Sequence, residues 1–488
     1  MGIVRRNSIF FTVIQYAGII LGYINTIILF PNFLDTDQYG LTRILLSVTI
    51  VISQFGQLGT PSMVVRYYPY LHKKVLYYGF LICSAGLTAV LSILWIFKTP
   101  ITNWYIENSA LFVEYFYLLV PFAIAMVFYN LFDAYLKALY KNVVSATMPF
   151  IILRIIWMVL ILMYSQGQFD FHTFILSYSL SYAVITLVTL IYIALLNELP
   201  DDFHVHEADK TYLKQIRDFN SFNILSGLSS HLINKVDQLM LGSLIGLPAV
   251  SIYAIAAAMV SVIRVPASAI ARTAPSLIAE AFKRNDIRSI ADLYKKSSIN
   301  QMILSGTVFC LILLNYDLLL VFIPDEYGES FLIFLFLGLS QVIDTGAGIN
   351  GFIMVNSKYY RVDALFSIGL LVVTIVLNLV FIPLFGIIGA AFATALSILV
   401  YNITRLLFLR IKMGLSPFTG ASMPIFLLLT LTTATLYLVP LTGNTWWDAI
   451  LRSVLFLLLT GPVIYFKRYS PELSELLDII LRRIRGKG

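Results

Sequence analysis

Long apolar segments, separated by short polar connections, make up most of the chain. Each segment holds about 20 residues, the length that an α-helix needs to cross a bilayer. We therefore predict fourteen membrane-spanning helices, at approximately 8–30, 41–64, 76–97, 109–131, 147–165, 173–196, 219–246, 249–271, 298–322, 331–355, 364–383, 386–409, 421–441 and 447–466. The connections are too short for a soluble domain, which needs at least about 50 residues. The pattern predicts an all-α integral membrane protein.

The seventh segment, 219–246, is unusually polar for a membrane span. At about 100° per residue, its polar side chains gather on one face of the helix. A charge in hydrocarbon costs at least about 2.5–3.5 kcal/mol, so we expect this face to line a water-accessible cavity. Its polar members include Asn220, Asn223, Ser230, His231, Asn234, Asp237 and Gln238, and the same segment carries Lys235.

The two halves of the chain resemble one another. Arg6-Asn7-Ser8 opens the first span and Phe219-Asn220-Ser221 opens the seventh, while Tyr39 and Pro61 are as far apart as Tyr253 and Pro275. Six spans separate the copies, so both have the same orientation in the membrane. We predict two parallel six-helix bundles at 1–200 and 201–412, two additional spans within 413–470, and a cytoplasmic amphipathic tail at 471–488.

Composition and charge support this interpretation. The chain is 59% hydrophobic and 12% charged, with a mean hydropathy of +0.86, whereas soluble domains carry about 25% charged residues. Alternate connections hold 27 of the 33 Lys and Arg residues, which predicts that both termini are cytoplasmic. This distribution explains the net charge of +7 without a nucleic-acid partner. Cys83 and Cys310 lie in apolar segments, so we expect neither a disulfide nor a metal site there.

Two short motifs resemble sites of other protein classes. Gly346, Gly348 and Gly351 spell G-x-G-x-x-G, but inside an apolar segment rather than after a strand. We therefore expect close helix packing or local unwinding there, and no nucleotide. Asp35 and Asp37 in the first outer connection could ligate a metal, but two acids in a short loop are more typical of a solvated turn. We predict no catalytic residue, metal ligand or cofactor.

The sequence resembles the polysaccharide transporter family of the multidrug/oligosaccharidyl-lipid/polysaccharide exporter superfamily over essentially its whole length. The resemblance is carried by Arg6-Asn7-Ser8, Asp37-Gln38-Tyr39-Gly40 and Asn234-x-x-Asp237-x-x-x-Leu241-Gly242. It implies a V-shaped pair of bundles around a cationic cavity in the bacterial inner membrane. It also implies a flippase that moves an undecaprenyl-diphosphate-linked oligosaccharide to the outer leaflet by alternating access. Such a flippase serves the synthesis of surface polysaccharide: O-antigen of lipopolysaccharide, capsule or exopolysaccharide.

The resemblance also suggests which residues contact the substrate. In the related lipid II flippases, arginines on spans 1, 2 and 8 line the cavity, and Arg43 and Arg264 fall on spans 2 and 8 here. Span 1 has no basic residue between Arg6 and Phe30, and Lys235 is our candidate for the missing charge. We expect these cations to bind the diphosphate, because arginine and lysine both pair with phosphate. The sugar hydroxyls would contact the polar stripe, represented by Gln15, Gln54, Asn223, Asn234 and Gln238.

Two further charged residues within spans leave alternatives open. Asp237 is our candidate for coupling to H⁺ or Na⁺, with a structural role as the alternative. Arg154, on the fifth span, could be either a structural partner or a functional cation. The sequence identifies neither the coupling ion nor the sugar.

Two other functions compete with the flippase. A multidrug or organic-cation antiporter of the same superfamily would need an acidic cavity, whereas Arg43, Lys235 and Arg264 outnumber Asp237 and Glu114. A membrane polysaccharide polymerase or ligase would need positioned acids or bases on the outer face, where the short loops offer few. The partners we expect are lipid-linked oligosaccharide, membrane lipids and other polysaccharide assembly proteins.

Overall fold

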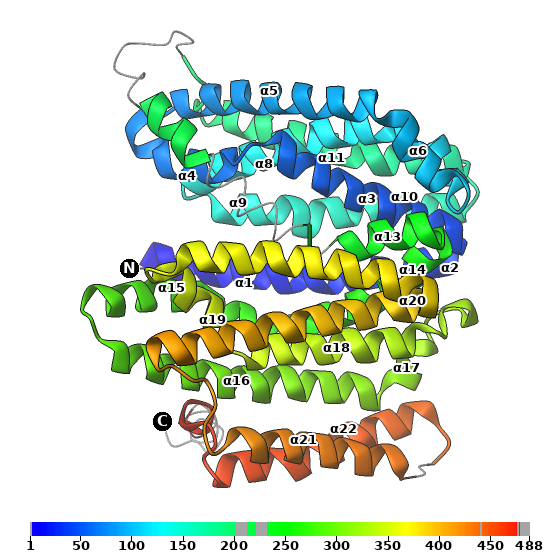
Figure 1. Cartoon of the computed structure of the whole chain (residues 1–488). Coiled ribbons are helices and arrows are strands. Elements are labelled where there is room, and N and C mark those ends of the chain that lie inside the picture. Colours follow the sequence, from blue (N-terminus) through cyan, green and yellow to red (C-terminus); the bar gives the residue numbers. More distant parts are fainter. Residues whose placement is uncertain are drawn as a thin grey trace. The chain divides into compact units, whose positions relative to one another are not determined.

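A computed structural model describes residues 2–201, 212–220, 232–233, 235–439, 442–475 and 478. Helices and their connections account for this described part of the chain, in which no strand occurs. The chain divides into two compact units, 1–254 and 255–488 (Figure 1).

The first unit is a bundle with α8 at its centre, where α8 packs against α3, α4, α5 and α11. Two segments, η1 and η3, are π-helical, and each extends directly into an α-helix. The elements of this unit are α1 (Gly2–Tyr23), η1 (Ile24–Leu29), α2 (Phe30–Phe33), α3 (Thr36–Gly56), α4 (Thr60–Leu71), α5 (Lys74–Ile96), α6 (Lys98–Ile106), α7 (Ala110–Glu114), η2 (Phe116–Leu118), α8 (Leu119–Ala138), α9 (Asn142–Thr147), η3 (Met148–Ile152), α10 (Leu153–Ser165), α11 (Phe171–Leu195), α13 (Val236–Leu244) and the first part of α14 (Leu247–Ser261).

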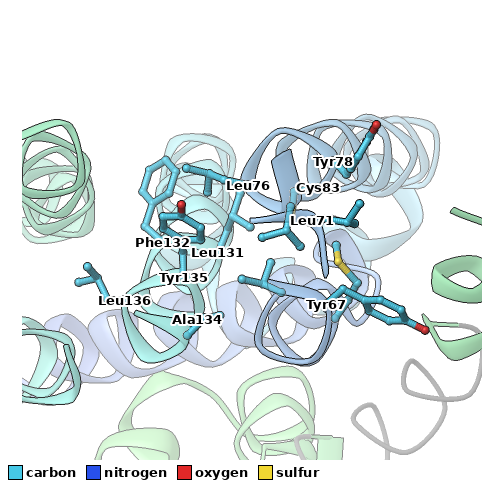
Figure 2. Packing of buried hydrophobic residues seen from close by; sticks show 14 of the residues in the cluster. Tyr67, Leu71, Leu76, Tyr78, Cys83, Leu131, Phe132, Ala134, Tyr135 and Leu136 are labelled. Atoms are coloured by element: carbon cyan, nitrogen blue, oxygen red, sulfur yellow. The ribbon is translucent and has the colours of Figure 1, made fainter. Parts of the chain in front are cut away.

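A hydrophobic core fixes α8 from one side. Tyr67 and Leu71 of α4, Leu76 of α5, and Leu131 and Tyr135 of α8 are buried against one another (Figure 2). The chain can return from α3 into α4 because Gly59 adopts a left-handed conformation, with φ of 74°. The packing holds α8 in place, and with it the polar residues near the C-terminal end of this helix.

The second unit is organised around α16, which packs against α15, α18, α21 and α22. The long helix α20 covers α18 and α19. The elements of the second unit are the rest of α14, η4 (Val262–Arg264), α15 (Val265–Lys283), α16 (Ile287–Leu314), α17 (Tyr316–Leu320), η5 (Asp325–Tyr327), α18 (Ser330–Gly346), α19 (Asn350–Asn356), α20 (Tyr360–Met413), α21 (Ser422–Leu438) and α22 (Thr445–Phe466).

Ten helices in the described part of the chain are long and apolar enough to cross a membrane, or eleven when the bent pair α18–α19 forms one span. The 54 residues of α20 would extend for about 80 Å, far more than the roughly 30 Å of hydrocarbon. The helix is interrupted at Gly386, where φ is 61° and ψ is −138°, so it contains both spans predicted at 364–383 and 386–409. The predicted all-helical membrane fold is confirmed. The seventh span falls largely outside the described residues, and the boundary expected at 200/201 stays a prediction.

The two alternatives given for the G-x-G-x-x-G motif, close helix packing and local unwinding, both occur. The α18 helix ends at Gly346 and α19 begins at Asn350, with a bend of 50° between them. Gly348, at the bend, has φ of +70°. A Cβ on Gly351 would lie 2.9 Å from Nη1 of Arg405, so this glycine permits a close contact between α19 and α20. The motif is a break in a membrane helix.

Acidic residues in two connections that the charge pattern predicts to lie outside cap the helices that follow them. The carboxylate of Asp35 accepts a hydrogen bond from the backbone N–H of Gln38 at 2.7 Å, and the side-chain oxygen of Gln38 accepts one from the backbone N–H of Asp35. Asp170 caps α11 in a similar way through Thr173, which holds the pKa of this carboxyl below its usual value. Such caps satisfy backbone donors that a helix start leaves unpaired. The loop acid Asp35 therefore has a structural explanation, in agreement with the predicted turn.

Candidate functional site

Arg43, on α3 of the first unit, packs against two aromatic rings. Its guanidinium carbon lies 5.3 Å from the ring centre of Phe30 and 4.8 Å from that of Tyr39. Its Nη2 donates to the hydroxyl of Thr26 at 3.1 Å. The Nε is buried without a hydrogen-bond partner, although such donors normally have one. The side chain is held in place and retains donor capacity for a further acceptor.

Arg154, in the first turn of α10, crosses the face of α1. Its Nη1 donates to the backbone carbonyl of Gly18 at 2.5 Å, and its guanidinium lies 5.9 Å from the ring centre of Phe150. A Cβ on Gly22 would lie only 1.4 Å from Nη1 of Arg154, and one on Gly18 would lie 2.6 Å from Cβ of Phe150. The Gly18–Gly22 pair therefore serves helix packing, and it also makes room for an arginine.

The π-helical segment η1 connects the two arginines. Thr26 accepts the hydrogen bond from Arg43, and its neighbour Asn25 donates to the backbone carbonyl of Arg154 at 2.8 Å. A π-helical turn widens the helix by one residue and occurs frequently at functional sites. The apolar pattern of span 1 predicts a continuous helix and gives no sign of this widening.

Lys235, half-buried before α13, is the third cation of this region. Arg43 lies within electrostatic range of both Lys235 and Arg154. Within the described part of the chain, no ion pair joins any of these three cations to an acidic side chain. We call Arg43, Arg154 and Lys235 the cationic cluster. An unneutralised group of this kind inside a membrane protein is costly, and its chemistry suits a phosphate-bearing ligand.

Two predicted site residues on α13 are buried and tied to neighbouring helices. Gln238 accepts a hydrogen bond from the hydroxyl of Ser47 on α3, and it is 7% exposed. Asp237 accepts one from the hydroxyl of Tyr253 on α14 at 2.5 Å, and it is 5% exposed. Both contacts hold α13 in the first unit. Coupling of Asp237 to H⁺ or Na⁺ stays a prediction.

Gln54 lines a pocket of about 390 Å³ in the first unit. We call this the Asp133 pocket, after the carboxylate in its wall. Its polar lining is formed by Ser53, Gln54, Tyr129, Asn130, Asp133, Lys137, Ser145 and Tyr182. Sequence reasoning missed Asp133 because this residue falls just beyond the apolar segment that ends near 131 and beside the basic Lys137. The signal available was the i, i+4 spacing of these two charges on a continuing helix.

The remaining predicted residues are dispersed. Gln15 lies half-buried on α1 and does not line the Asp133 pocket. Arg264 is exposed at the break between α14 and α15, in the second unit, so its expected place in the substrate cavity stays a prediction. Asn223 and Asn234 lie outside the described residues.

Polar residues of the second unit form a network of side-chain hydrogen bonds between α18, α19 and α20. Asn402 donates to the carboxylate of Asp344 at 3.1 Å and accepts from Asn350 at 3.0 Å. On the same helix, Arg405 pairs with the buried Asp363 at 2.5 Å. The side-chain partner of Asp344 is therefore an amide.

Comparison with known proteins gives the family. The family model described as "Polysaccharide biosynthesis protein" matches residues 4–277, more than half of the chain. The chain belongs to this family. No curated protein matches the sequence. Membership confirms the resemblance drawn from the sequence motifs.

Solved structures show the same fold for this polysaccharide biosynthesis protein. The lipid II flippase MurJ, in an inward closed conformation, matches with a TM-score of 0.75 and 14% identity over 95% of this chain and 100% of that one. An inward-facing multidrug resistance MATE transporter matches with a TM-score of 0.62 and 16% identity over 83% and 94%. A MOP superfamily transporter from Pyrococcus furiosus matches with a TM-score of 0.50 and 15% identity over 84% and 95%. The protein is thus a multi-pass membrane protein with a transporter fold.

Proposed function

We propose that the protein is a flippase for undecaprenyl-diphosphate-linked oligosaccharide, acting by alternating access in the bacterial inner membrane during surface polysaccharide synthesis. The cationic cluster is the observation that carries the proposal. A diphosphate cannot cross hydrocarbon without compensating partners, because desolvation of its charge is prohibitive. Arg43, Arg154 and Lys235 provide such partners, and none of them forms an ion pair with a carboxylate among the described residues.

The members of the cluster have different roles in this proposal. Arg43 and Arg154 present planar guanidinium groups that bind phosphate oxygens through paired hydrogen bonds. Lys235 supplies a compact positive charge. Arg264 is a further candidate cation for the diphosphate, and Asp237 takes up the coupling H⁺ or Na⁺. The polar residues of the first unit receive the sugar, and the lipid tail stays in the bilayer.

The organic-cation antiporter is the alternative that the fold leaves open, because a MATE transporter shares this fold with a TM-score of 0.62. Charge separates the two functions. A cationic substrate would be repelled by the cationic cluster, whereas a diphosphate would be attracted. The MOP superfamily transporter from Pyrococcus furiosus, which shares this fold, is described as having a binding pocket of reverse polarity.

Transport in proteoliposomes tests the proposal. The substrate is lipid-linked oligosaccharide purified from cells that lack the protein, and the assay measures its appearance in the opposite leaflet. We expect Arg154→Gln to reduce transport by about 10- to 100-fold, the effect of losing a hydrogen bond to a charged group. Arg288→Gln, at an exposed position in the first turn of α16, is the matched control and should transport normally. Export of a cationic dye without any movement of the lipid-linked sugar would refute the flippase and support the antiporter.

A further inference from the structure

The Asp133 pocket has a different chemistry from the cationic cluster. The carboxylate of Asp133 pairs with Lys137 at 2.5 Å and also accepts a hydrogen bond from the hydroxyl of Ser145. The Asp133 side chain is 15% exposed and that of Lys137 is 49% exposed. The two charges compensate one another, so the pocket as a whole favours neither a diphosphate nor an organic cation. A neutral ligand with hydroxyl groups suits it better.

Two lining residues of this pocket, Gln54 and Asn130, are linked by hydrogen bonds through the side chain of Gln57. Gln57 donates to the side-chain oxygen of Gln54 at 2.6 Å, and Asn130 donates to that of Gln57 at 3.2 Å. Within the described part of the chain, the amide nitrogen of Gln54 and the side-chain oxygen of Asn130 have no hydrogen-bond partner. This row of hydrogen-bonded amides therefore offers a ligand one donor, the amide nitrogen of Gln54, and one acceptor, the side-chain oxygen of Asn130.

Aromatic residues complete the lining. Tyr129, Tyr182, Phe11 and Phe150 contribute to the same pocket. Its volume of about 390 Å³ lies within the range of roughly 300–1,000 Å³ that is typical of small-molecule sites. A sugar ring has hydroxyl groups at its rim and apolar C–H faces, so it needs both the polar and the aromatic parts of such a lining.

The pocket adjoins the cationic cluster. Phe150 lines the pocket, and the guanidinium of Arg154 lies over its ring. Tyr182 also lines the pocket and is within electrostatic range of Arg154. A sugar in the pocket and a phosphate at Arg154 would therefore be neighbours, as they are in a sugar diphosphate.

We propose that the Asp133 pocket is a saccharide subsite, which takes a neutral sugar next to the diphosphate, with Asp133 accepting hydrogen bonds from its hydroxyl groups. This inference rests on the proposed flippase function and names the part of the substrate that the pocket binds. The positive-inside pattern places Lys137 and Lys141 on the cytoplasmic side, where the headgroup lies before transport. The subsite would act on the inward-facing substrate.

Binding measurements with two lipids test the subsite in the full-length protein. One probe is undecaprenyl diphosphate, which has no sugar, and the other is undecaprenyl-diphosphate-linked oligosaccharide from cells that lack the protein. We expect Asp133→Asn and Asn130→Ala to weaken binding of the sugar-bearing lipid by about 10-fold or more, and to leave binding of undecaprenyl diphosphate unchanged. Retained binding of the sugar-free lipid also shows that the variants fold. Glu107→Gln also replaces a carboxylate by an amide, but at an exposed position. This variant is the control and should bind both lipids normally.

A double variant separates contact with the sugar from a structural role. In Asp133→Asn with Lys137→Gln, no unpaired lysine remains, so a purely structural defect would be relieved. We expect sugar-dependent binding to stay weak in this variant, and free oligosaccharide to compete only in the wild-type protein. Restored binding would overturn the subsite, as would equal weakening of both probes or no weakening of either. Failure of the wild-type protein to bind either lipid would instead refute the flippase function itself.

Discussion

At the scale of single residues, Gly22 provides the space that Arg154 occupies. A Cβ at this position would lie 1.4 Å from Nη1 of Arg154, and the guanidinium is also held by the carbonyl of Gly18. We expect Gly22→Ala to displace Arg154 and to destabilise the protein by about 1–3 kcal/mol, as overpacking of a filled site does. The measurement is the midpoint of thermal unfolding of the purified protein.

The control for Gly22 is Gly369→Ala in α20. A Cβ on Gly369 would meet no atom within 4 Å, so this change adds the same methyl group to a membrane helix without a clash. Its unfolding midpoint should stay close to that of the wild-type protein. Equal midpoints for the two variants would show that Arg154 does not depend on the space at Gly22.

The same residues show what the sequence can and cannot predict about the site. The close packing of Gly18 and Gly22 was predictable because small residues at i, i+4 mark helix contacts. Their contact with Arg154 was not, because it joins positions more than 100 residues apart in the chain. Asp133 was missed for a local reason. The α8 helix continues to Ala138, beyond the apolar segment that ends near 131, so the sequence pattern assigned its last charged residues to a loop.

At the scale of elements, the break between α18 and α19 depends on one glycine. Gly348 has φ of +70°, and a Cβ there would lie 3.0 Å from Oγ of Ser297 and 3.2 Å from Cα of Ser298. We expect Gly348→Ala to destabilise the protein by about 1–3 kcal/mol. Alanine is strained at positive φ, and its Cβ would be in close contact with the backbone of α16 at Ser298. The midpoint temperature of thermal unfolding and the rate of transport of lipid-linked oligosaccharide should both decrease.

Gly346, two residues earlier, offers a close control. A Cβ on Gly346 would lie 4.0 Å from the nearest atom, Cβ of Met302, so Gly346→Ala should unfold at nearly the wild-type temperature. If both variants behave alike, the left-handed conformation at Gly348 is not what maintains the bend.

The elements themselves were predicted well because their apolar segments are long. Spans 2 to 6 correspond to helices of the first unit, and spans 11 and 12 lie within α20 on either side of Gly386. Hydropathy could not predict the π-helical segments η1 and η3 or the bend angle at α18–α19. These features depend on packing against neighbouring helices, which a single apolar pattern does not encode.

At the scale of the whole molecule, orientation in the membrane determines from which side the Asp133 pocket is reached. The alternation of basic connections predicts that Glu107 lies outside and Asn285 lies in the cytoplasm, and both are exposed. A test begins with Cys83→Ala and Cys310→Ala, which remove the two buried thiols. Single cysteines are then introduced as Glu107→Cys and Asn285→Cys.

A membrane-impermeant maleimide should label the cysteine at 107 in intact spheroplasts, and label the one at 285 only after the membrane is opened. This labelling pattern is expected because moving lysine- and arginine-rich connections across the bilayer is costly. Such connections therefore stay on the cytoplasmic side, where the protein is synthesised. The reverse order would place Lys137, and the Asp133 pocket beside it, on the outer side. The pocket would then meet the sugar after transport rather than before it, and it would act in release instead of loading.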